Sequence, residues 1–381
     1  DRAETSSVPQ ELPLFPEGMD DAAAWRACPP INLDLPWDHP DNYWGRYVYR
    51  TVNHFKDKVK VWEIWNEPDR TDFWVGSPSE YARLLQIGYQ AAKAADPEAV
   101  VLFGGIAYWG NQSFYELTLA ELQTLEGAAE NNGYFDAFSL HLYSNVYQLG
   151  SIPPIIQAEM ASTVGSHPIW LTETGVPIWG ESQHPDPYVN AATAEEAAAF
   201  MIEGYAEARA AGVERFFVFR THDQAMDRAF GLIRDDRSLR PGYVAYQVAA
   251  RYLNGENQIT GPFSNGTVRR ITFWGTPHGR IDVLWKETGG DPTQYQQSAV
   301  VPTATLIDHR GHPQRIDANG GMYSVPLQPA TADTRYDGGY IIGGPPVLLI
   351  QSDAETPSST LRPLPDFVHT TTLTVTWDVT D

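Results

Sequence analysis

Short apolar runs alternate with amphipathic stretches over most of the first 255 residues. The apolar runs are rich in β-branched and aromatic side chains, which is typical of buried strands. The stretches between them repeat their apolar side chains at intervals of three and four residues, which is typical of helices. The runs predicted as strands are 59–67, 100–104, 135–143, 169–172 and 215–220.

Several of the amphipathic stretches have recognisable ends. Ser79 would cap one helix, which closes at Asp96-Pro97, and Thr193 would cap an Ala-rich helix that ends at Gly212. The predicted helices are 42–56, 80–95, 113–126, 155–164, 194–211 and 241–253, with a further short helix near 20–27. Five strand–helix units in this order predict a parallel sheet covered by helices.

The pattern changes after residue 255. Apolar side chains then alternate with a period of two, and Gly, Pro and Asp turns separate the runs. The strands predicted here are 267–274, 280–286, 299–308, 321–326 and 346–350. This part predicts a small all-β sandwich over 256–350. Residues 351–381 are predicted to be a Ser/Thr/Pro-rich linker, 351–365, followed by the first strand of a further β domain.

The amino-acid composition limits the classes of partner that the protein is expected to bind. The chain has 48 Asp and Glu against 26 Lys and Arg, a net charge of −22, which argues against nucleic acid and anionic membrane surfaces as partners. No apolar run is long enough to span a bilayer, and one cysteine, Cys28, excludes an internal disulfide. No metal-ligand spacing or phosphate-binding loop stands out in the sequence, so we expect no cofactor and no metal.

Two of the predicted strands end on a carboxylate. The run VKVWEIWNEP ends on Asn66 and Glu67 before Pro68, which cannot continue a sheet. The run SHPIWLTETGV ends on Glu173. A glycosidase needs two carboxyl groups, one to protonate the leaving oxygen and one to meet the anomeric carbon. By itself, however, Asn-Glu-Pro occurs by chance in roughly one chain in twenty of this length, and a strand-end Glu is often only a solvated cap.

The wider sequence decides between these interpretations. After WEIWNEP come a predicted helix, strand and helix, then HLY at 141–143, and then TETG at 172–175. Over about residues 29–255 this sequence resembles the clan A glycoside hydrolases, which are retaining enzymes on a (β/α)8 TIM barrel. Within the clan it most resembles the β-xylosidase and α-L-iduronidase family. The resemblance implies an α/β catalytic barrel over 1–255.

A barrel of this kind needs eight strand–helix units. Only 58 residues precede the first predicted strand, and they hold one clear helix, 42–56, which resembles the third helix of the family. The first three units are therefore not visible in this sequence. We expect an N-terminal segment or a second chain to complete the barrel, and we expect both ends of the sequence to be cuts through a longer polypeptide.

The resemblance also implies roles for the residues at the strand ends. Glu67 would be the general acid/base and Glu173 the nucleophile. Asn66 would hydrogen-bond the sugar 2-hydroxyl, His141 would line the sugar-binding subsite, and Tyr143 would hydrogen-bond Glu173. Without the resemblance, strand-end capping would explain Asn66, and a hydrogen-bonded pair in the barrel core would explain His141 and Tyr143.

Three further residues complete the predicted substrate-binding site. Trp109 and Trp179 follow strand ends and could stack on sugar rings, although ordinary packing explains each of them equally well. His222 lies in RTHD at 220–223, where the family usually has a Trp platform. The missing Trp leaves the choice of substrate open.

Two functions follow from this pattern. The favoured one is a retaining glycosidase that acts on poly- or oligosaccharides, with a β-xyloside preferred, at an extracellular or cell-surface location. The alternative is a non-catalytic carbohydrate-binding or structural protein that kept both glutamates but lost three barrel strands. An open sheet of five units would expose unpaired edges, which soluble proteins avoid, and this favours the enzyme.

Overall fold

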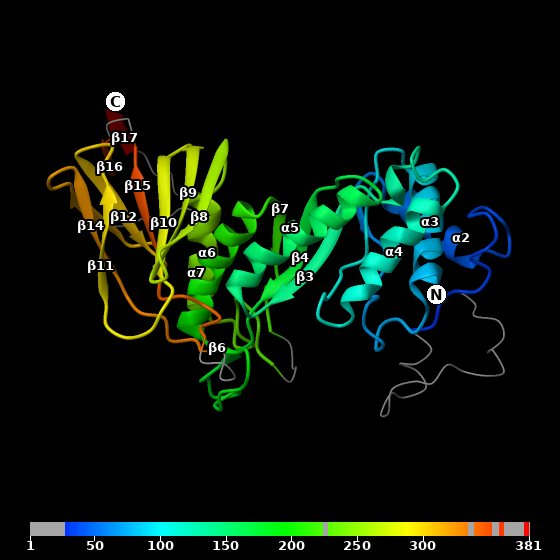
Figure 1. Cartoon of the computed structure of the whole chain (residues 1–381), viewed down its shortest axis with the longest axis horizontal. Coiled ribbons are helices and arrows are strands. Elements are labelled where there is room, and N and C mark those ends of the chain that lie inside the picture. Colours follow the sequence, from blue (N-terminus) through cyan, green and yellow to red (C-terminus); the bar gives the residue numbers. More distant parts are fainter. Residues whose placement is uncertain (1–26, 224–227, 334–338, 353–357, 362–376, 381) are drawn as a thin grey trace, which may run out of the picture.

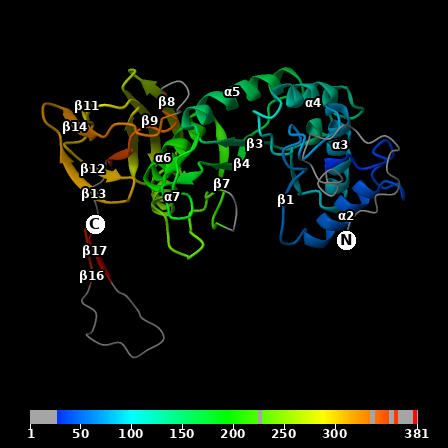
Figure 2. The same cartoon turned by 90° about the horizontal axis from the view of Figure 1, so that it is seen from below.

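The structure is a computed structural model that describes residues 27–223, 228–333, 339–352, 358–361 and 377–380. Three regions follow one another along its longest axis (Figure 1). Helices gather at one end, parallel strands covered by further helices lie in the middle, and antiparallel strands form the other end. The view from below shows the same order (Figure 2). The predicted helix near 20–27 lies, except for its last residue, outside the described residues.

The middle region is built on a parallel sheet with the strand order β1-β2-β3-β4-β7. Single bridges from Leu102 to Ala137 and from Ile106 to Leu140 join the β1-β2 pair to the other three strands. All five predicted strands are therefore present, although β1 is much shorter than predicted. The strands are β1 (Val61–Glu63), β2 (Val100–Leu102), β3 (Phe138–Tyr143), β4 (Ile169–Gly175) and β7 (Val213–Val218), with a separate short pair of β5 (Ile178–Trp179) and β6 (Ala192–Thr193).

The helices between these strands begin and end close to the predicted positions. Thr193 and Glu196 form a capping box at the start of α6, as the sequence predicted for Thr193. Helix α3 begins two residues earlier than predicted, because Ser77 and not Ser79 is the N-cap residue. The helices are α2 (Tyr43–Phe55), α3 (Pro78–Ala95), α4 (Gln112–Thr124), α5 (Val146–Ser162), α6 (Ala194–Ala210) and α7 (Pro241–Tyr252), with a 3-10 turn η1 (Asn132–Tyr134).

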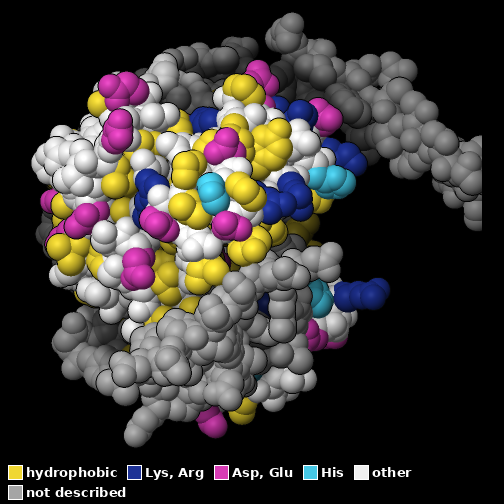
Figure 3. Space-filling model, turned by 90° about the vertical axis from the view of Figure 1, so that its right-hand side faces the viewer, with side chains coloured by type: hydrophobic (Ala, Val, Ile, Leu, Met, Phe, Trp, Pro, Cys, Tyr) yellow, Lys and Arg dark blue, Asp and Glu magenta, His cyan; other side chains and the backbone are white. Residues whose placement is uncertain are grey.

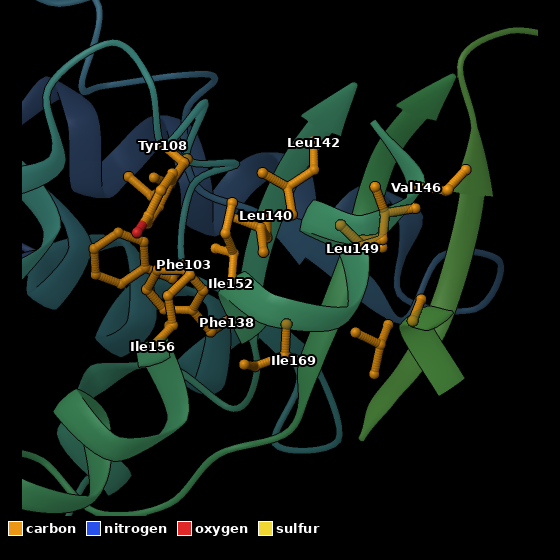
Figure 4. Packing of buried hydrophobic residues seen from close by; sticks show 14 of the residues in the cluster. Phe103, Tyr108, Phe138, Leu140, Leu142, Val146, Leu149, Ile152, Ile156 and Ile169 are labelled. Atoms are coloured by element: carbon orange, nitrogen blue, oxygen red, sulfur yellow. The ribbon is translucent and has the colours of Figure 1, made fainter. Parts of the chain in front are cut away.

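Helix α5 begins earlier than the predicted 155–164 and contains two prolines, Pro153 and Pro154. Each proline removes a backbone donor from the helix. The Asn145 side chain caps the helix by accepting a hydrogen bond from the Tyr147 amide (3.0 Å). The early turns are held by packing, because Leu149 and Ile152 point toward the strands and are buried (Figure 4). Burial of each such side chain contributes about 1.5–3 kcal/mol, which offsets the lost hydrogen bonds.

One large hydrophobic core connects the helices to the sheet. Phe103, after β2, stacks on Phe138 of β3 with ring centroids 4.8 Å apart, and both rings are fully buried. In Figure 4 these rings lie under the face of α5 that carries Ile156. The other face of the sheet holds a smaller cluster of Leu102, Ala137 and Trp170. The sheet is thus packed against helices on one face and carries the functional side chains at one end.

The C-terminal region consists of antiparallel strands, as predicted. Six strands form a sheet in the order β13-β12-β15-β10-β9-β8, and β11 pairs with β14. Strands β8, β11 and β13 were not predicted, because their exposed side chains leave little apolar alternation. The strands are β8 (Gln258–Ser264), β9 (Val268–Thr276), β10 (Gly279–Lys286), β11 (Thr293–Ser298), β12 (Thr303–Asp308), β13 (Pro313–Asp317), β14 (Met322–Leu327) and β15 (Val347–Gln351).

The last described residues form a separate antiparallel pair, β16 (Ser358–Leu361) with β17 (Trp377–Thr380). Strand β16 falls within the stretch that was predicted as a linker. Most of the strand predicted at 368–379 lies outside the described residues.

The surface of the helical end mixes hydrophobic side chains with charges of both signs (Figure 3). On α2, Tyr47 and Phe55 are exposed by 50% and 42%. None of the described helices has the length and apolar character needed to cross a membrane.

Candidate active site

Glu67 is held at the end of β1 by a backbone that departs from ordinary strand geometry. Its amide donates to the Gly105 carbonyl (2.8 Å), and Asn66 forms a parallel bridge with Gly105. The φ angles of Trp65 and Glu67 are +77° and +43°, in the left-handed region that non-glycine residues rarely adopt. Such backbone strain is concentrated at functional sites.

The Glu67 carboxylate is buried between two potential cations. Its Oε1 lies 3.0 Å from His141 Nδ1, and its Oε2 lies 3.3 Å from Arg70 Nε. Arg70 also donates to Asp72, and mainly this hydrogen bond raises the pKa of the guanidinium. Each oxygen of Glu67 therefore has a polar contact, and together these contacts fix the orientation of the side chain.

Glu173 reaches the same place from β4. Tyr143 donates its hydroxyl hydrogen to Glu173 Oε2 (2.5 Å), and His141 Nδ1 lies 3.6 Å from the same oxygen. A carboxylate oxygen of Glu67, one of Glu173 and a ring nitrogen of His141 all lie within 4.8 Å of one another. The fold thus brings together four residues that the sequence predicted at one site.

The three carboxylates around His141 control its protonation. Burial alone would lower the pKa of the imidazole, but the nearby Glu63 carboxylate, the hydrogen bond to Glu67 and the charge of Glu173 raise it to about 9. His141 is therefore an imidazolium near neutral pH. The three side chains are close enough to surround a cation, but a protonated ring has no lone pair for a metal. Burial and the charge of Glu173 also raise the pKa of Tyr143, which keeps its hydroxyl a donor.

Two glycines give the site its close packing. A Cβ atom on Gly105 would lie 2.0 Å from His141 Nε2, so the imidazole rests directly on this residue. A Cβ on Gly104 would lie 2.5 Å from the Ile64 carbonyl oxygen. The Gly-Gly pair after β2 thus lets β1 and the His141 ring approach the same backbone.

A cleft of about 1100 Å³ opens over these residues. Trp109 projects at its rim with 61% of its surface exposed, and its indole donates to Gln148 (3.2 Å). Burial raises the pKa of Asp69 in the cleft wall, although the hydrogen bond that Asp69 accepts from the Ala107 amide acts to lower it. The lining residues are Glu67, Asp69, Arg70, Thr71, Asp72, Ala107, Trp109, Gly110, Asn111, His141, Tyr143, Ser144, Asn145, Gln148, Asn190, Arg228 and Ile341.

The other predicted residues are not among these lining residues, and this includes Glu173, which lies beside His141 and Tyr143. Asn66 is half-buried beside Glu67, and Trp179 is the second residue of β5. His222 is exposed after β7 and bridges to Ile233. The next residue, Asp223, is buried and forms an ion pair with Arg240 (2.6 Å), so structural contacts fix this loop.

Several site residues were not predicted from the sequence. Arg70, Asp69 and Arg228 line the cleft but belong to no motif that points to this chemistry. Glu63 lies in β1 and contacts the same His141 ring (3.8 Å). Its signal was present in the sequence, because a carboxylate in the middle of an apolar strand needs a polar partner.

Part of the chain is similar to a known family of glycosyl hydrolases. Residues 41–169 match the model of glycosyl hydrolases family 39. A β-xylosidase of Geobacillus stearothermophilus is 30% identical over 122 residues, which are 30% of this chain and 22% of that protein. The family resemblance that the motifs predicted is therefore confirmed. The matched part spans about a fifth of the length of this relative.

The fold is shared with solved glycoside hydrolases. A family 39 glycoside hydrolase from Bacteroides cellulosilyticus WH2 is similar with a TM-score of 0.60 and 19% identity, over 81% of this chain and 62% of that one. A monomeric β-xylosidase from Caulobacter crescentus CB15 is similar with a TM-score of 0.51 and 13% identity, over 90% of this chain and 80% of that one. At such identities the likeness supports a common architecture: a mixed α/β part followed by a region rich in β-sheet.

Proposed function

We propose that this chain, whose residues 41–169 match glycosyl hydrolase family 39, acts as a retaining glycoside hydrolase with Glu67 and Glu173 as its catalytic pair. One observation carries the proposal: an oxygen of the Glu67 carboxylate lies within 4.8 Å of an oxygen of the Glu173 carboxylate. Retaining glycosidases hold their carboxyl groups about 5–5.5 Å apart, whereas inverting enzymes need about 6.5–9.5 Å to admit a water molecule. The separation favours direct attack by a carboxylate.

The reaction takes two steps. In the first, a Glu173 oxygen bonds to the anomeric carbon as the glycosidic C–O bond breaks, and Glu67 gives its proton to the leaving oxygen. In the second, Glu67 takes a proton from water, the water oxygen bonds to the anomeric carbon, and the bond to Glu173 breaks. The sugar leaves with its original anomeric configuration, and both carboxyl groups return to their starting states.

The neighbouring side chains support these roles. The Tyr143 hydroxyl holds one Glu173 oxygen, which leaves the other for attack. His141 lies between the two carboxylates, and Asn66 is placed beside the acid, where it would bind the sugar 2-hydroxyl. Trp109 would stack on a sugar ring at the rim of the cleft. Trp179 and His222 stay predictions of the sequence.

The substrate proposed is a β-xyloside or a related glycoside. A relative named β-xylosidase and a structural neighbour of the same name support this choice. Release of nitrophenol from a panel of aryl β-xyloside, β-glucoside, α-arabinoside and α-iduronide substrates would test it. We expect the fastest turnover on the xyloside. A clear preference for another sugar would change the proposed substrate and leave the proposed mechanism standing.

Substitution of the catalytic pair tests the mechanism. Glu67→Gln and Glu173→Gln should each lower kcat/KM by at least about a thousandfold, since each removes a group required in the transition state. Glu121→Gln, at an exposed position on α4, serves as the matched control. A variant of Glu67 or Glu173 with near wild-type activity would disprove that residue's assignment.

The covalent intermediate gives a second and more specific test. A 2-deoxy-2-fluoro xyloside with a good leaving group should add one fluorosugar to the protein, and peptide mapping should place it on Glu173. Attachment to another residue would show that the nucleophile is wrongly assigned. Nothing in the described residues or the comparisons favours the non-catalytic alternative.

The five-stranded sheet is proposed to belong to a (β/α)8 barrel over 1–255, beside an accessory β-sandwich over 256–350 and a further β segment after 351. Among the described residues β1 and β7 each have one unpaired edge, and exposed edges favour further pairing. An N-terminal segment or a second chain would supply the other strands. The denatured and native masses of the purified protein would distinguish these sources.

An extracellular or cell-surface location is also proposed. The net charge of −22 and a polysaccharide substrate outside the cell support it. Activity recovered only from the cytoplasmic fraction of the source cells would contradict this location.

A further inference from the structure

Glu63 occupies a position beneath the catalytic pair that the two-step reaction does not use. Its Oε1 accepts a hydrogen bond from the Gly105 amide (3.1 Å), and its Oε2 accepts one from the Ser139 hydroxyl (2.9 Å). Ser139 in turn contacts the Thr172 hydroxyl. One side chain on β1 is thus connected to the end of β2, to β3 and, through Ser139, to β4.

The contact with Gly105 reaches the acid/base directly. Gly105 donates its N–H to Glu63, while its carbonyl accepts from the Glu67 amide (2.8 Å). Glu63 therefore holds the residue that holds the strained backbone of Glu67. A shift of Gly105 would move Glu67 relative to Glu173.

The second contact is with the imidazole of His141. His141 Nε2 is buried and has no hydrogen-bond partner among the described residues, and Glu63 Oε1 lies 3.8 Å from it. The opposite nitrogen, Nδ1, faces Glu67 at 3.0 Å and Glu173 at 3.6 Å. Glu63 is thus the carboxylate on the far side of the ring, and Arg70, beside Glu67, is the further cation at this site.

We propose that Glu63 is a positioning residue of the catalytic centre, which holds the backbone of Glu67 through Gly105 and keeps His141 as a donor between Glu67 and Glu173. The catalytic part of this inference rests on the proposed glycosidase function. With a carboxylate on each side, the ring carries a proton on both nitrogens, so Nδ1 presents N–H toward Glu173, and toward Glu67 at the stages of the reaction in which Glu67 is ionised. The pKa of His141, raised to about 9, agrees with this arrangement.

The test is the titration of His141 in the full chain. Proteins labelled with ¹⁵N-histidine would be titrated by NMR as wild type, Glu63→Gln, Glu63→Asp and Glu121→Gln, and His141→Asn would identify the signal. Glu63→Gln keeps the size and one acceptor but removes the charge, so the His141 midpoint should fall by about one pH unit or more. Glu63→Asp should recover part of the shift, and Glu121→Gln should leave the midpoint unchanged.

Kinetics and stability complete the test. Glu63→Gln should lower kcat on an aryl β-xyloside at least about tenfold with a smaller change in KM, because the catalytic pair moves while the cleft is retained. Its melting temperature should stay within about 4 °C of wild type. An unchanged His141 midpoint, or a wild-type kcat and pH profile, would overturn the proposal. A wild-type protein inactive on every glycoside would overturn the glycosidase function, and the titration would still decide the role of Glu63 at His141.

Discussion

Tyr143 shows how a single side chain orients the proposed nucleophile. Its hydroxyl is the donor to Glu173 Oε2, and its ring meets Phe219 and Phe230 edge-on, with centroids 5.9 and 5.7 Å away. Strand β3 places it two residues after His141, so both side chains leave the strand on the same face. The aromatic packing holds the ring, and the hydroxyl then holds the carboxylate.

We predict that Tyr143→Phe lowers kcat/KM by about 10- to 100-fold. A hydrogen bond to a charged group is worth about 1.5–3 kcal/mol, and the variant removes it while keeping the ring. Steady-state kinetics on an aryl β-xyloside would measure the loss. Tyr246→Phe, at an exposed position on α7, is the matched control and should behave as wild type. An unchanged kcat/KM for Tyr143→Phe would mean that Glu173 needs no orienting donor.

At the scale of elements, the start of α3 shows the contribution of a cap. The Ser77 hydroxyl oxygen accepts a hydrogen bond from the Glu80 amide (3.2 Å), and the Glu80 carboxylate accepts one from the Ser77 amide (2.7 Å). This capping box satisfies two amides that would otherwise lack partners. The hydroxyl of Tyr81 in α3 donates a hydrogen bond to the carbonyl of Ile64, which follows β1. The cap therefore also supports the segment that leads to Glu67.

Ser77→Ala should lower the free energy of unfolding by about 1 kcal/mol, the usual value of an N-cap. Ser79→Ala, two residues later, should change it by less than about 0.5 kcal/mol, because the side chain is exposed and makes no cap. Urea unfolding of both variants would measure the difference. A larger loss of unfolding free energy for Ser79→Ala than for Ser77→Ala would show that Ser79 is the N-cap residue, as predicted from the sequence.

At the scale of the whole molecule, helix α6 joins the parallel sheet to the C-terminal strands. Glu203 of α6 is fully buried, and its Oε2 accepts a hydrogen bond from the Gly343 amide (2.8 Å). Burial raises the pKa of Glu203 well above its usual range, the Gly343 amide opposes this, and the charge of Glu207 adds to it. Glu207 itself is paired with Arg269 of β9. A buried carboxyl group therefore lies in the joint between the two regions.

This joint should make stability depend on pH. The unfolded chain releases the Glu203 proton near its ordinary pKa, about 4.3, whereas the folded protein keeps it. The stabilising contribution is complete below that pH and is lost as the pH rises through the raised folded value. In urea unfolding between pH 4 and 8, Glu203→Gln should therefore gain stability relative to wild type as the pH rises. Parallel curves for the two proteins would show that Glu203 ionises freely in the fold.

The sequence predicted most of the architecture from local signals. Apolar periodicity placed five strands and their helices, because each element buries one face whatever its partners are. It failed where tertiary packing replaced a local preference, as for Pro153 and Pro154 inside α5. It also missed polar edge strands such as β11, whose partner β14 supplies the apolar side chains.

The same division holds for the site. Glu67 and Glu173 could be found from the sequence because the chemistry fixes their types and the strand ends fix their places. The roles of Asn66, His141 and Tyr143 followed only from the family resemblance. The sequence by itself determined which residues carry the proposed chemistry. The tertiary structure alone decided that His141 meets Glu67 and Tyr143 meets Glu173 within hydrogen-bonding distance, and that Glu63 lies behind His141. Residues far apart in the chain meet only where neighbouring strands align.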